Sequence, residues 1–294
     1  MLRIGVDLGG SKTEGIVMDE SGEILARERR PTPQADGYRA ILANVRDLVL
    51  ELERRAGTNC RVGVGTPGAI STKTGFLKNA NTVCLNGQPI KQDMEILLAR
   101  EIRIANDANC FALSEAIDGA AQGEPVVFGV ILGTGVGGGI VVNGRLLEGA
   151  QHIAGEWGHN VLETDGPPCY CGKRGCVETF LSGPGLARDF AAQGGATLDA
   201  RAIATAAGQG DVLADAAMQR YLDRFGRALS VVINILDPDA IVLGGGMSNI
   251  ARLYTEGRDY VARHTFNDEL RTRILPNRHG DSSGVRGAAR LWPV

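Results

Sequence analysis

The sequence predicts an α/β protein of two related domains around a central cleft. Segments with strand and helix patterns alternate along the chain, and one glycine-rich hairpin pattern occurs twice, at residues 4–28 and 128–150. Each copy contains an apolar strand, a tight glycine turn, a second apolar strand, a polar turn and a third short strand. Because the two copies share one layout, we expect them in two related halves that face the same cleft.

The first 120 residues are predicted to alternate strands with helices. Apolar runs separated by turn signals predict strands at 2–8, 15–19, 23–29, 61–68 and 101–107. Helices are predicted over 38–54, where apolar side chains follow helical spacing, near 90–100, and over 108–120. The stretch from the fourth strand to Gln88 is rich in Gly, Asn, Thr and Lys, as expected of a surface or active-site loop.

The rest of the chain repeats the hairpin and then adds new material. The second hairpin unit covers 126–148, and it is followed by a cysteine-rich segment at 159–178 and by alanine-rich helices to about 236. A final strand at 239–243 is expected to pass through glycines into a helix, and 280–293 to form a capped helix. No low-complexity linker divides the chain. We therefore place the boundary from the repeat, near Asn106, with domains of 1–106 and 107–280.

The composition of the 294 residues excludes several classes of protein. With 44% hydrophobic residues, 22% charged residues and a formal net charge of −3, the chain has no basic excess, so we expect no nucleic-acid partner. It has no signal-peptide pattern and no apolar run that would span a membrane. We therefore expect a cytoplasmic protein whose six cysteines are reduced.

The first glycine turn follows a strand and resembles a phosphate-binding loop. It offers backbone N–H, hydroxyl and ammonium donors from Gly9, Gly10, Ser11, Lys12 and Thr13. Asp7, at the end of the strand, can hold Mg²⁺ directly or through water. The alternative is an ordinary glycine hairpin in which Asp7 caps a turn. Because the order Ser-Lys-Thr does not supply the Gly-Lys-Ser/Thr ending, a Walker A motif is excluded.

Two further glycine segments are candidates for nucleotide binding. Gly133, Thr134 and Gly135 begin a G-x-G-x-x-G match, but a strand follows it rather than a helix, so a dinucleotide-binding loop is excluded. Gly244, Gly245 and Gly246 follow a buried strand and could admit a flat adenosine group. The alternative there is close packing between a strand and a helix.

An acidic residue stands where a strand is predicted to meet a helix. Asp107 at such a junction can accept a hydroxyl proton during phosphoryl transfer, although aspartate is also a common helix N-cap. Its place between the two glycine hairpins favours the catalytic role. Glu156, His159 and Glu178 add acceptors suited to a polyhydroxylated substrate, whose hydroxyls must be paired when they leave water.

The cysteine-rich segment contains a metal-ligand pattern. One His and three Cys, in the spacing H-x9-C-x-C-x4-C, match a closed structural Zn²⁺ site at His159, Cys169, Cys171 and Cys176. The alternative is free surface thiols in a reducing cell. With all four positions filled by protein, we expect the zinc to be structural and to orient His159 and Glu178 toward substrate.

Taken in order, these motifs resemble the ROK family of sugar kinases: DLGGSKT, Asn106-Asp107, GTGVGGGI, GEWGH, CYCGKRGCVE and LGGGMSN. The resemblance covers essentially the whole chain. It implies the actin-like ATPase (ribonuclease H-like) fold, in which two α/β domains close on sugar and Mg-ATP. It also implies a homodimer, with the last helix, about 281–294, packed back on the N-terminal domain.

The family pattern assigns roles to the candidate residues. It implies that Asp107 is the general base, that Asn106, Glu156, His159 and Glu178 bind sugar hydroxyls, and that the glycine loops hold ATP. Ser11 stands where the family more often has Thr, which keeps the hydroxyl. Since the chain begins at the first phosphate strand, we expect none of the DNA-binding helices of the family's repressors.

Three further segments are most similar to bacterial fructokinases that also accept mannose: KNANTVCLNGQP, ANDANC and HGDSSGVRGAARLWP. The resemblance therefore predicts transfer of the ATP γ-phosphate to the 6-hydroxyl of a hexose, fructose first. Glucokinases and N-acetylhexosamine kinases share the catalytic residues and remain alternatives. An alternative of another class is a sugar-binding sensor without catalysis, which Asp107 and the complete phosphate loops disfavour.

Overall fold

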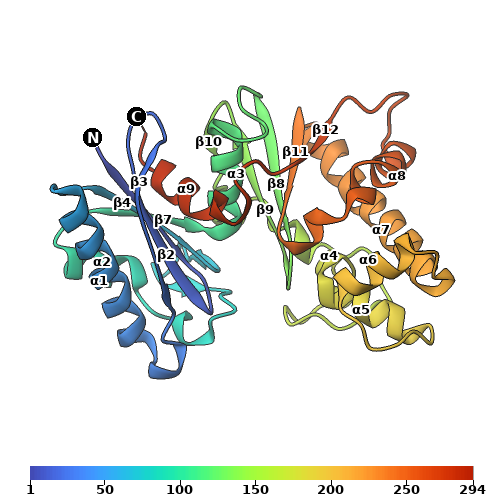
Figure 1. Cartoon of the computed structure of the whole chain (residues 1–294), viewed down its shortest axis with the longest axis horizontal. Coiled ribbons are helices and arrows are strands. Elements are labelled where there is room, and N and C mark those ends of the chain that lie inside the picture. The colour runs from blue at the N-terminus through green and yellow to red at the C-terminus, as the bar shows by residue number, and fades with distance from the viewer. Residues whose placement is uncertain (294) are drawn as a thin grey trace.

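The computed structural model describes residues 1–293 and contains two five-stranded sheets side by side (Figure 1). The strand order is β3-β2-β1-β4-β7 in the first sheet and β10-β9-β8-β11-β12 in the second. In each sheet a hairpin and a third strand are antiparallel, and two further strands extend the sheet in parallel. The repeated hairpin is therefore the start of a repeated sheet, as its two copies predict.

The predicted strands are present with bounds that differ by up to three residues, the largest difference being at β2, which begins at Lys12. The strand β12 has no predicted counterpart, because the sequence predicts β11 as the last strand. The first sheet consists of β1 (Arg3–Leu8), β2 (Lys12–Met18), β3 (Ile24–Pro31), β4 (Arg61–Thr66) and β7 (Ile102–Asn106). The second consists of β8 (Val126–Leu132), β9 (Val136–Val142), β10 (Arg145–Leu146), β11 (Ala240–Gly244) and β12 (Arg273–Pro276). A small hairpin, β5 (Ala69–Ile70) and β6 (Leu77–Lys78), lies in the predicted loop.

The helices form an inner pair and two outer groups (Figure 1). The inner pair is α3 (Asp107–Ile117) and α9 (Ser283–Arg290), which pack on each other between the sheets. Outside the first sheet lie α1 (Tyr38–Ala56) and α2 (Ile90–Leu98). Outside the second lie α4 (Val177–Leu181), α5 (Gly183–Ala192), α6 (Ala200–Gly208), α7 (Val212–Leu236) and α8 (Glu256–His264).

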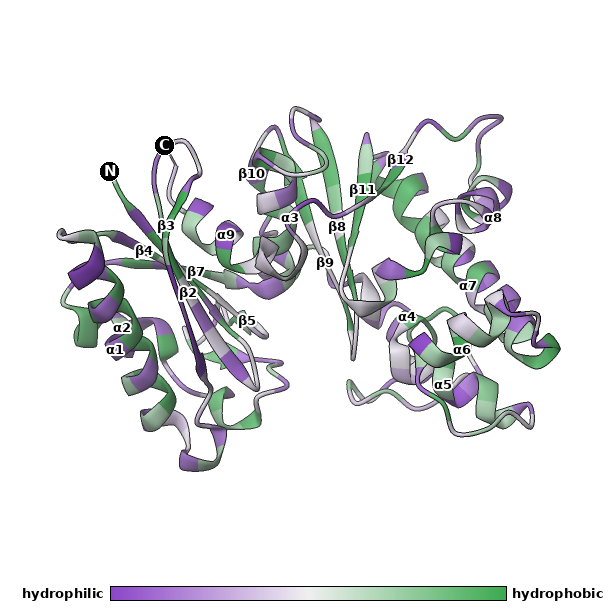
Figure 2. Cartoon of the chain, in the orientation of Figure 1, coloured by the Kyte–Doolittle hydropathy of each residue, from purple (hydrophilic) through white to green (hydrophobic). Residues whose placement is uncertain are grey.

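Apolar periodicity explains how these layers hold together. On α1, Ile41, Val45, Leu48 and Leu52 recur at helical spacing and are fully buried against the first sheet. In the second sheet every residue of β11 is buried, and Figure 2 shows β8 and β11 as largely apolar. Within residues 1–293, no helix is both long enough and apolar enough to cross a membrane.

The last helix returns to the first sheet. α9 contacts β1 and β4 as well as α3, and Gly287 lets it approach α3 closely, since a Cβ there would lie 1.7 Å from Cys110 O. The start of α9 and the segment leading into it are held by Glu115 of α3, which is fully buried and accepts bonds from Ser283 Oγ (2.7 Å) and Arg278 N–H (3.1 Å). The helix is shorter than predicted, its Ser282 makes no side-chain cap, and Val294 lies outside the described residues.

The predicted helix after Gly244–Gly246 is wrong. Two short 3₁₀ helices, Gly246–Asn249 and Ala251–Leu253, follow instead, and α8 begins only at Glu256. The reason is local competition for the backbone, because Ser248 Oγ donates to Gly245 O (2.7 Å) and Tyr254 Oη donates to Ser248 O (2.7 Å).

Candidate active site

The site is centred on the junction of β7 with α3. Asn106 is the N-cap of α3, because its Oδ1 accepts from Ala108 N–H at 2.9 Å, while its Nδ2 donates to Gly68 O at 3.1 Å. Asp107 is the first helical residue, and its Oδ1 also accepts from Ala108 N–H, at 2.8 Å. The capping role thus belongs to Asn106, and Asp107 is held in a fixed orientation beside it.

Carboxylates from both halves meet at this junction. Burial, opposed by the Ala108 N–H and reinforced by the charge of Glu156, raises the pKa of Asp107 to about 6. Burial, followed by the charges of Asp107 and Glu14, raises the pKa of Asp7 to about 7. Glu156 from the second half is therefore near enough to influence the ionisation of Asp107 on α3, and Asp107 that of Asp7 in the first sheet.

Glu156 connects this group to the cysteine-rich segment. Burial raises its pKa, Glu178 raises it further, and His159 and Lys78 act in the opposite direction. Four of the residues that the sequence predicts to line a substrate site therefore converge: Asp107, Glu156, His159 and Glu178. Of the residues acting on Glu156, Lys78 alone was not a sequence candidate; a lysine in an Asn-rich loop was its only signal.

A tryptophan turn places Glu156 and His159. Glu156 is the N-cap of the 3₁₀ turn Trp157–His159, and His159 is its last residue. Trp157 anchors the turn by donating from Nε1 to Gly137 O (3.0 Å) and by packing edge-on against Phe128 (5.7 Å between ring centroids). The GEWGH motif therefore ties two candidate binding residues to β9.

The first glycine turn is supported from within its own half. Gly9 N–H donates to Lys12 O (3.0 Å), which closes the turn, and Thr32 Oγ1 donates to Gly9 O (2.8 Å). Thr13 is fully buried, and its hydroxyl lies 2.8 Å from that of Thr32. The Thr13 hydroxyl therefore contacts Thr32 beneath the turn, while Ser11 and Lys12 lie at its exposed edge.

The second glycine turn lies beside the third glycine segment. Gly245 has φ +79°, and a Cβ on it would lie 2.4 Å from Leu132 O, the carbonyl that leads into Gly133. Gly183 N–H donates to Gly133 O (2.8 Å). The structure therefore brings Gly133–Gly135 and Gly244–Gly246 together in the second half, with Thr134 between the two turn glycines.

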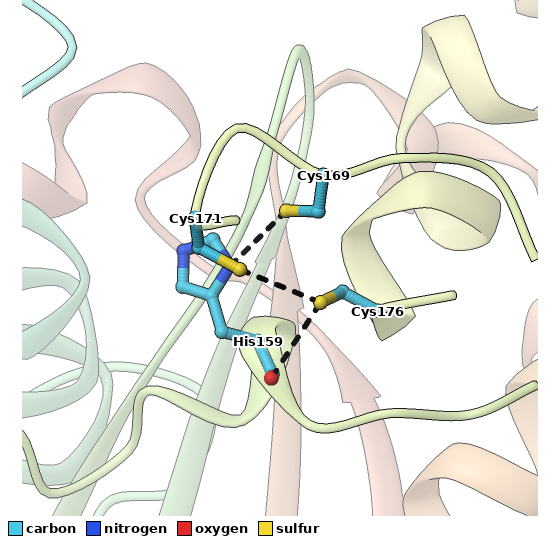
Figure 3. Close-up of side chains that lie close together, drawn as sticks. All are labelled: His159, Cys169, Cys171 and Cys176. Carbon is cyan, nitrogen blue, oxygen red and sulfur yellow. Dashed lines mark hydrogen bonds between the residues drawn. The ribbon is translucent and has the colours of Figure 1, made fainter. Parts of the chain in front are cut away.

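The four predicted metal ligands converge at one point (Figure 3). Their ligand atoms all lie within 4.8 Å of one another. His159 Nδ1 is 3.6 Å from Cys169 Sγ, and Cys171 Sγ is 3.6 Å from Cys176 Sγ. Sulfurs of a tetrahedral Zn²⁺ site with bonds of about 2.3 Å are about 3.8 Å apart, so this donor set fits the ion closely.

The metal-ligand loop is tied to both the second turn and the outer helices. Cys176 is the N-cap of α4, and two residues later Glu178 Oε2 accepts from Val136 N–H at 2.9 Å. On the other side, Glu163 Oε1 accepts from Arg224 Nε (2.9 Å) and forms an ion pair with Arg227, both on α7. Glu178 therefore links the metal-ligand loop to the glycine turn.

Loops of the two halves also touch directly beside the site. Lys78 Nζ donates to Gln151 O (3.3 Å), and His152 Nδ1 is 3.3 Å from Ile70 O. A cavity of about 820 Å³ lies next to these contacts; Gly68, Asn106 and His152 are among its lining residues. These contacts join segments more than 70 positions apart, so no sequence pattern indicated them.

Comparison with known proteins identifies the class to which this geometry belongs. The family model described as ROK family matches residues 3–294. An N-acetyl-D-glucosamine kinase of Escherichia coli O139:H28 is 41% identical over 297 residues, covering 98% of each chain. The chain belongs to the ROK family, as its motifs predict.

Two solved structures agree with the fold. The ROK hexokinase from Thermus thermophilus is 32% identical with a TM-score of 0.86, covering 98% of this chain and 97% of the other. A ROK family glucokinase from Streptomyces griseus, solved in complex with glucose and AMPPNP, is 29% identical with a TM-score of 0.80, covering 99% of each chain. The predicted actin-like ATPase fold, with two α/β halves, is confirmed.

Proposed function

We propose that the protein is an ATP-dependent hexose 6-kinase whose first substrate is N-acetyl-D-glucosamine. The observation that carries the proposal is the meeting of Asp107 with Glu156, Glu178 and His159 next to two glycine turns. We rank the sugars by the names of relatives, and the 41% identical relative is named an N-acetyl-D-glucosamine kinase. That name favours the N-acetylhexosamine alternative over the fructose expected from sequence resemblance, and we rank fructose, mannose and glucose after it.

Asp107 acts as the general base. Its carboxylate takes the proton from the sugar hydroxyl as the hydroxyl oxygen forms a bond to the γ-phosphorus and the bond from that phosphorus to the β-phosphate oxygen breaks. The Ala108 N–H holds the carboxylate in place, and the raised pKa brings its proton affinity nearer to working pH. ADP and the sugar 6-phosphate are the products.

The glycine turns bind the nucleotide in this proposal. Backbone N–H groups near Gly9–Gly10 and Gly133–Gly135 face phosphate oxygens, and Gly244–Gly246 admit the adenosine. Burial and the charge of Asp107 raise the pKa of Asp7, and a bound divalent cation would favour the ionised carboxylate there. Asp7 would hold Mg²⁺, which when bound neutralises phosphate charge.

Zinc has a structural role in this proposal. Three cysteines and His159 would hold it with no open coordination position, so it fixes the loop that carries His159 and Glu178. Asn106, Glu156, His159 and Glu178 then pair with sugar hydroxyls. A cytoplasmic location, which we also propose, keeps the thiols reduced.

Movement of the two halves completes the proposal. Residues 1–106 with the last helix form one body and 107–280 the other, and closure brings nucleotide and sugar together. The buried bonds of Glu115 to the start of α9 and the segment before it support a pivot there. A homodimer remains part of the proposal and is tested by sedimentation velocity.

The deciding experiment is a coupled ADP-release assay with Mg-ATP and four sugars: N-acetyl-D-glucosamine, fructose, mannose and glucose. We expect the highest kcat/KM for N-acetyl-D-glucosamine. A preference for another sugar would keep the mechanism and change the substrate. If folded, zinc-loaded protein binds a sugar but releases no ADP, the sensor alternative is correct.

A further inference from the structure

A tyrosine outside the family's metal pattern contacts the candidate sugar-binding histidine. Tyr170 lies between Cys169 and Cys171, and its Oη is 3.0 Å from His159 Nε2, the ring nitrogen turned away from the sulfurs. The two rings meet edge-on, with centroids 5.1 Å apart and planes at 89°. The phenol hydroxyl is therefore within hydrogen-bond distance of His159 Nε2, the ring nitrogen that does not face the metal-ligand cluster.

That nitrogen can satisfy only one partner at a time. An imidazole nitrogen has either one hydrogen or one lone pair, so it makes a single good hydrogen bond. His159 Nδ1 faces Cys169 Sγ at 3.6 Å, which leaves Nε2 as the one position for a sugar hydroxyl. The Tyr170 hydroxyl occupies that position in the structure.

We propose that Tyr170 is a positioning residue whose hydroxyl stands in for a sugar hydroxyl on His159 and is displaced when the sugar binds. This inference rests on the proposed function, since it takes His159 as a sugar ligand. It makes Tyr170 a residue that tunes affinity: the sugar must break the phenol–imidazole bond before it forms its own.

The surroundings of Tyr170 allow this exchange. The residue is 72% exposed, so its side chain can turn away without displacing the core. Its neighbours Cys169 and Cys171 belong to the metal-ligand cluster, so the backbone on both sides is held.

The test is Tyr170→Phe, which removes the hydroxyl and keeps the ring. We expect KM, and the Kd for sugar measured by calorimetry without ATP, to fall about twofold to tenfold, the range of one neutral hydrogen bond, with kcat unchanged. Tyr260→Phe is the matched control, because its hydroxyl donates to Gln219 Oε1 (2.8 Å) on the outer helices. Zinc content and Tm of both variants are measured alongside.

Monodeoxy sugars locate the exchanged hydroxyl. The probes are N-acetyl-D-glucosamine, or whichever of the four sugars has the highest kcat/KM, and its 1-, 3- and 4-deoxy analogues. We expect the gain from Tyr170→Phe to disappear for one analogue only, the one without the hydroxyl that replaces Tyr170 on His159.

Three results would overturn the inference: an unchanged or raised Kd in Tyr170→Phe, an equal fall in Tyr260→Phe, or an equal gain for every analogue. Failure of the proposed function gives a different pattern. If the wild type binds the sugar but does not phosphorylate it, the kinase proposal fails, and the Kd comparison still decides the role of Tyr170. If it binds none of the sugars, both proposals fail.

Discussion

The two glycine turns occupy the same place in the two sheets but differ in chemistry. The first, between β1 and β2, is flanked by Asp7 and Lys12 and supported by buried hydroxyls from its own half. The second, between β8 and β9, has no charged side chain from Gly133 to Val142. Its backbone is held by Glu178, which comes from the metal-ligand loop.

The difference shows how one repeated scaffold acquires two functions. Strand order and turn geometry are shared, so both turns can present N–H groups. The charges that distinguish them come from residues at their flanks or from segments added to one half. The following changes separate these contributions, beginning with the junction between the halves.

Asp107→Asn should have the largest effect on turnover, because Asp107 lies at the junction between the two halves as the proposed general base and supports neither glycine turn. We expect kcat to fall about 10²- to 10⁴-fold, the usual share of a general base. Stopped-flow or coupled-assay kinetics measure it. Near-normal turnover in a folded variant would show that another group takes the proton.

The pH dependence should follow the raised pKa of Asp107, about 6. Because the base must be ionised, we expect kcat/KM to fall about tenfold per pH unit below that value. The free energy of unfolding should change with pH in the opposite direction. The folded pKa lies above the ordinary value of 3.8, so the folded state favours the proton, and stability present below about pH 4 is lost as the pH rises through about 6.

Asp107→Asn should therefore be more stable than the wild type at pH 8, by up to about 3 kcal/mol in unfolding free energy, and should unfold at a higher temperature. The difference should shrink as the pH falls toward 4, where the folded wild-type carboxyl is protonated and the unfolded one is about half protonated. Thermal unfolding of the two proteins from pH 4 to 8 measures it. A difference that does not depend on pH would contradict the burial of an ionised Asp107.

Metal removal should affect the second half selectively. Chelation frees the loop that carries His159 and Glu178, so we expect sugar KM to rise at least about tenfold, the value of one hydrogen bond to a charged group, and Tm to fall. The KM for ATP should change less, because the first turn is supported by Thr32 instead. Full activity in protein verified as metal-free would rule out this role.

Gly135→Ala tests the link between Glu178 and the second turn. A Cβ at this position would lie 2.5 Å from Glu178 Oε2, so the carboxylate must move away from Val136 N–H. We expect sugar KM to rise about threefold to tenfold. Gly208→Ala, a methyl added to open space at the end of α6, is the control and should leave both KM values unchanged.

Thr32→Val should have the smallest effect and should be confined to the first half. It removes a bond to Gly9 O and leaves the buried Thr13 hydroxyl without its Thr32 partner. We expect a loss of about 1–2 kcal/mol in unfolding free energy and a small rise in the KM for ATP. Urea unfolding and ATP titration measure the two effects. A larger change in sugar KM would mean that the turns are coupled through the junction.

Short-range patterns predicted much of this protein. The hairpin repeat predicted two related sheets, because strand alternation and glycine turns are local properties. Four metal ligands within 18 positions predicted the convergence that the structure shows, since a short loop can bring its own ends together. Asp107 at a strand–helix junction was likewise a local signal.

Contacts between distant segments were beyond such patterns. Glu178 on Val136, Lys78 on Gln151 and Glu115 on the first residue of α9 join positions 42 to 168 residues apart. The strand-glycine-helix prediction failed at Gly246 because Ser248 and Tyr254 bind the backbone there. Tyr170, a spacer in the ligand pattern, meets His159 only because the loop folds over it. The partner of each polar side chain in the site depends on segments that only folding brings together. A single segment of the sequence therefore does not determine it.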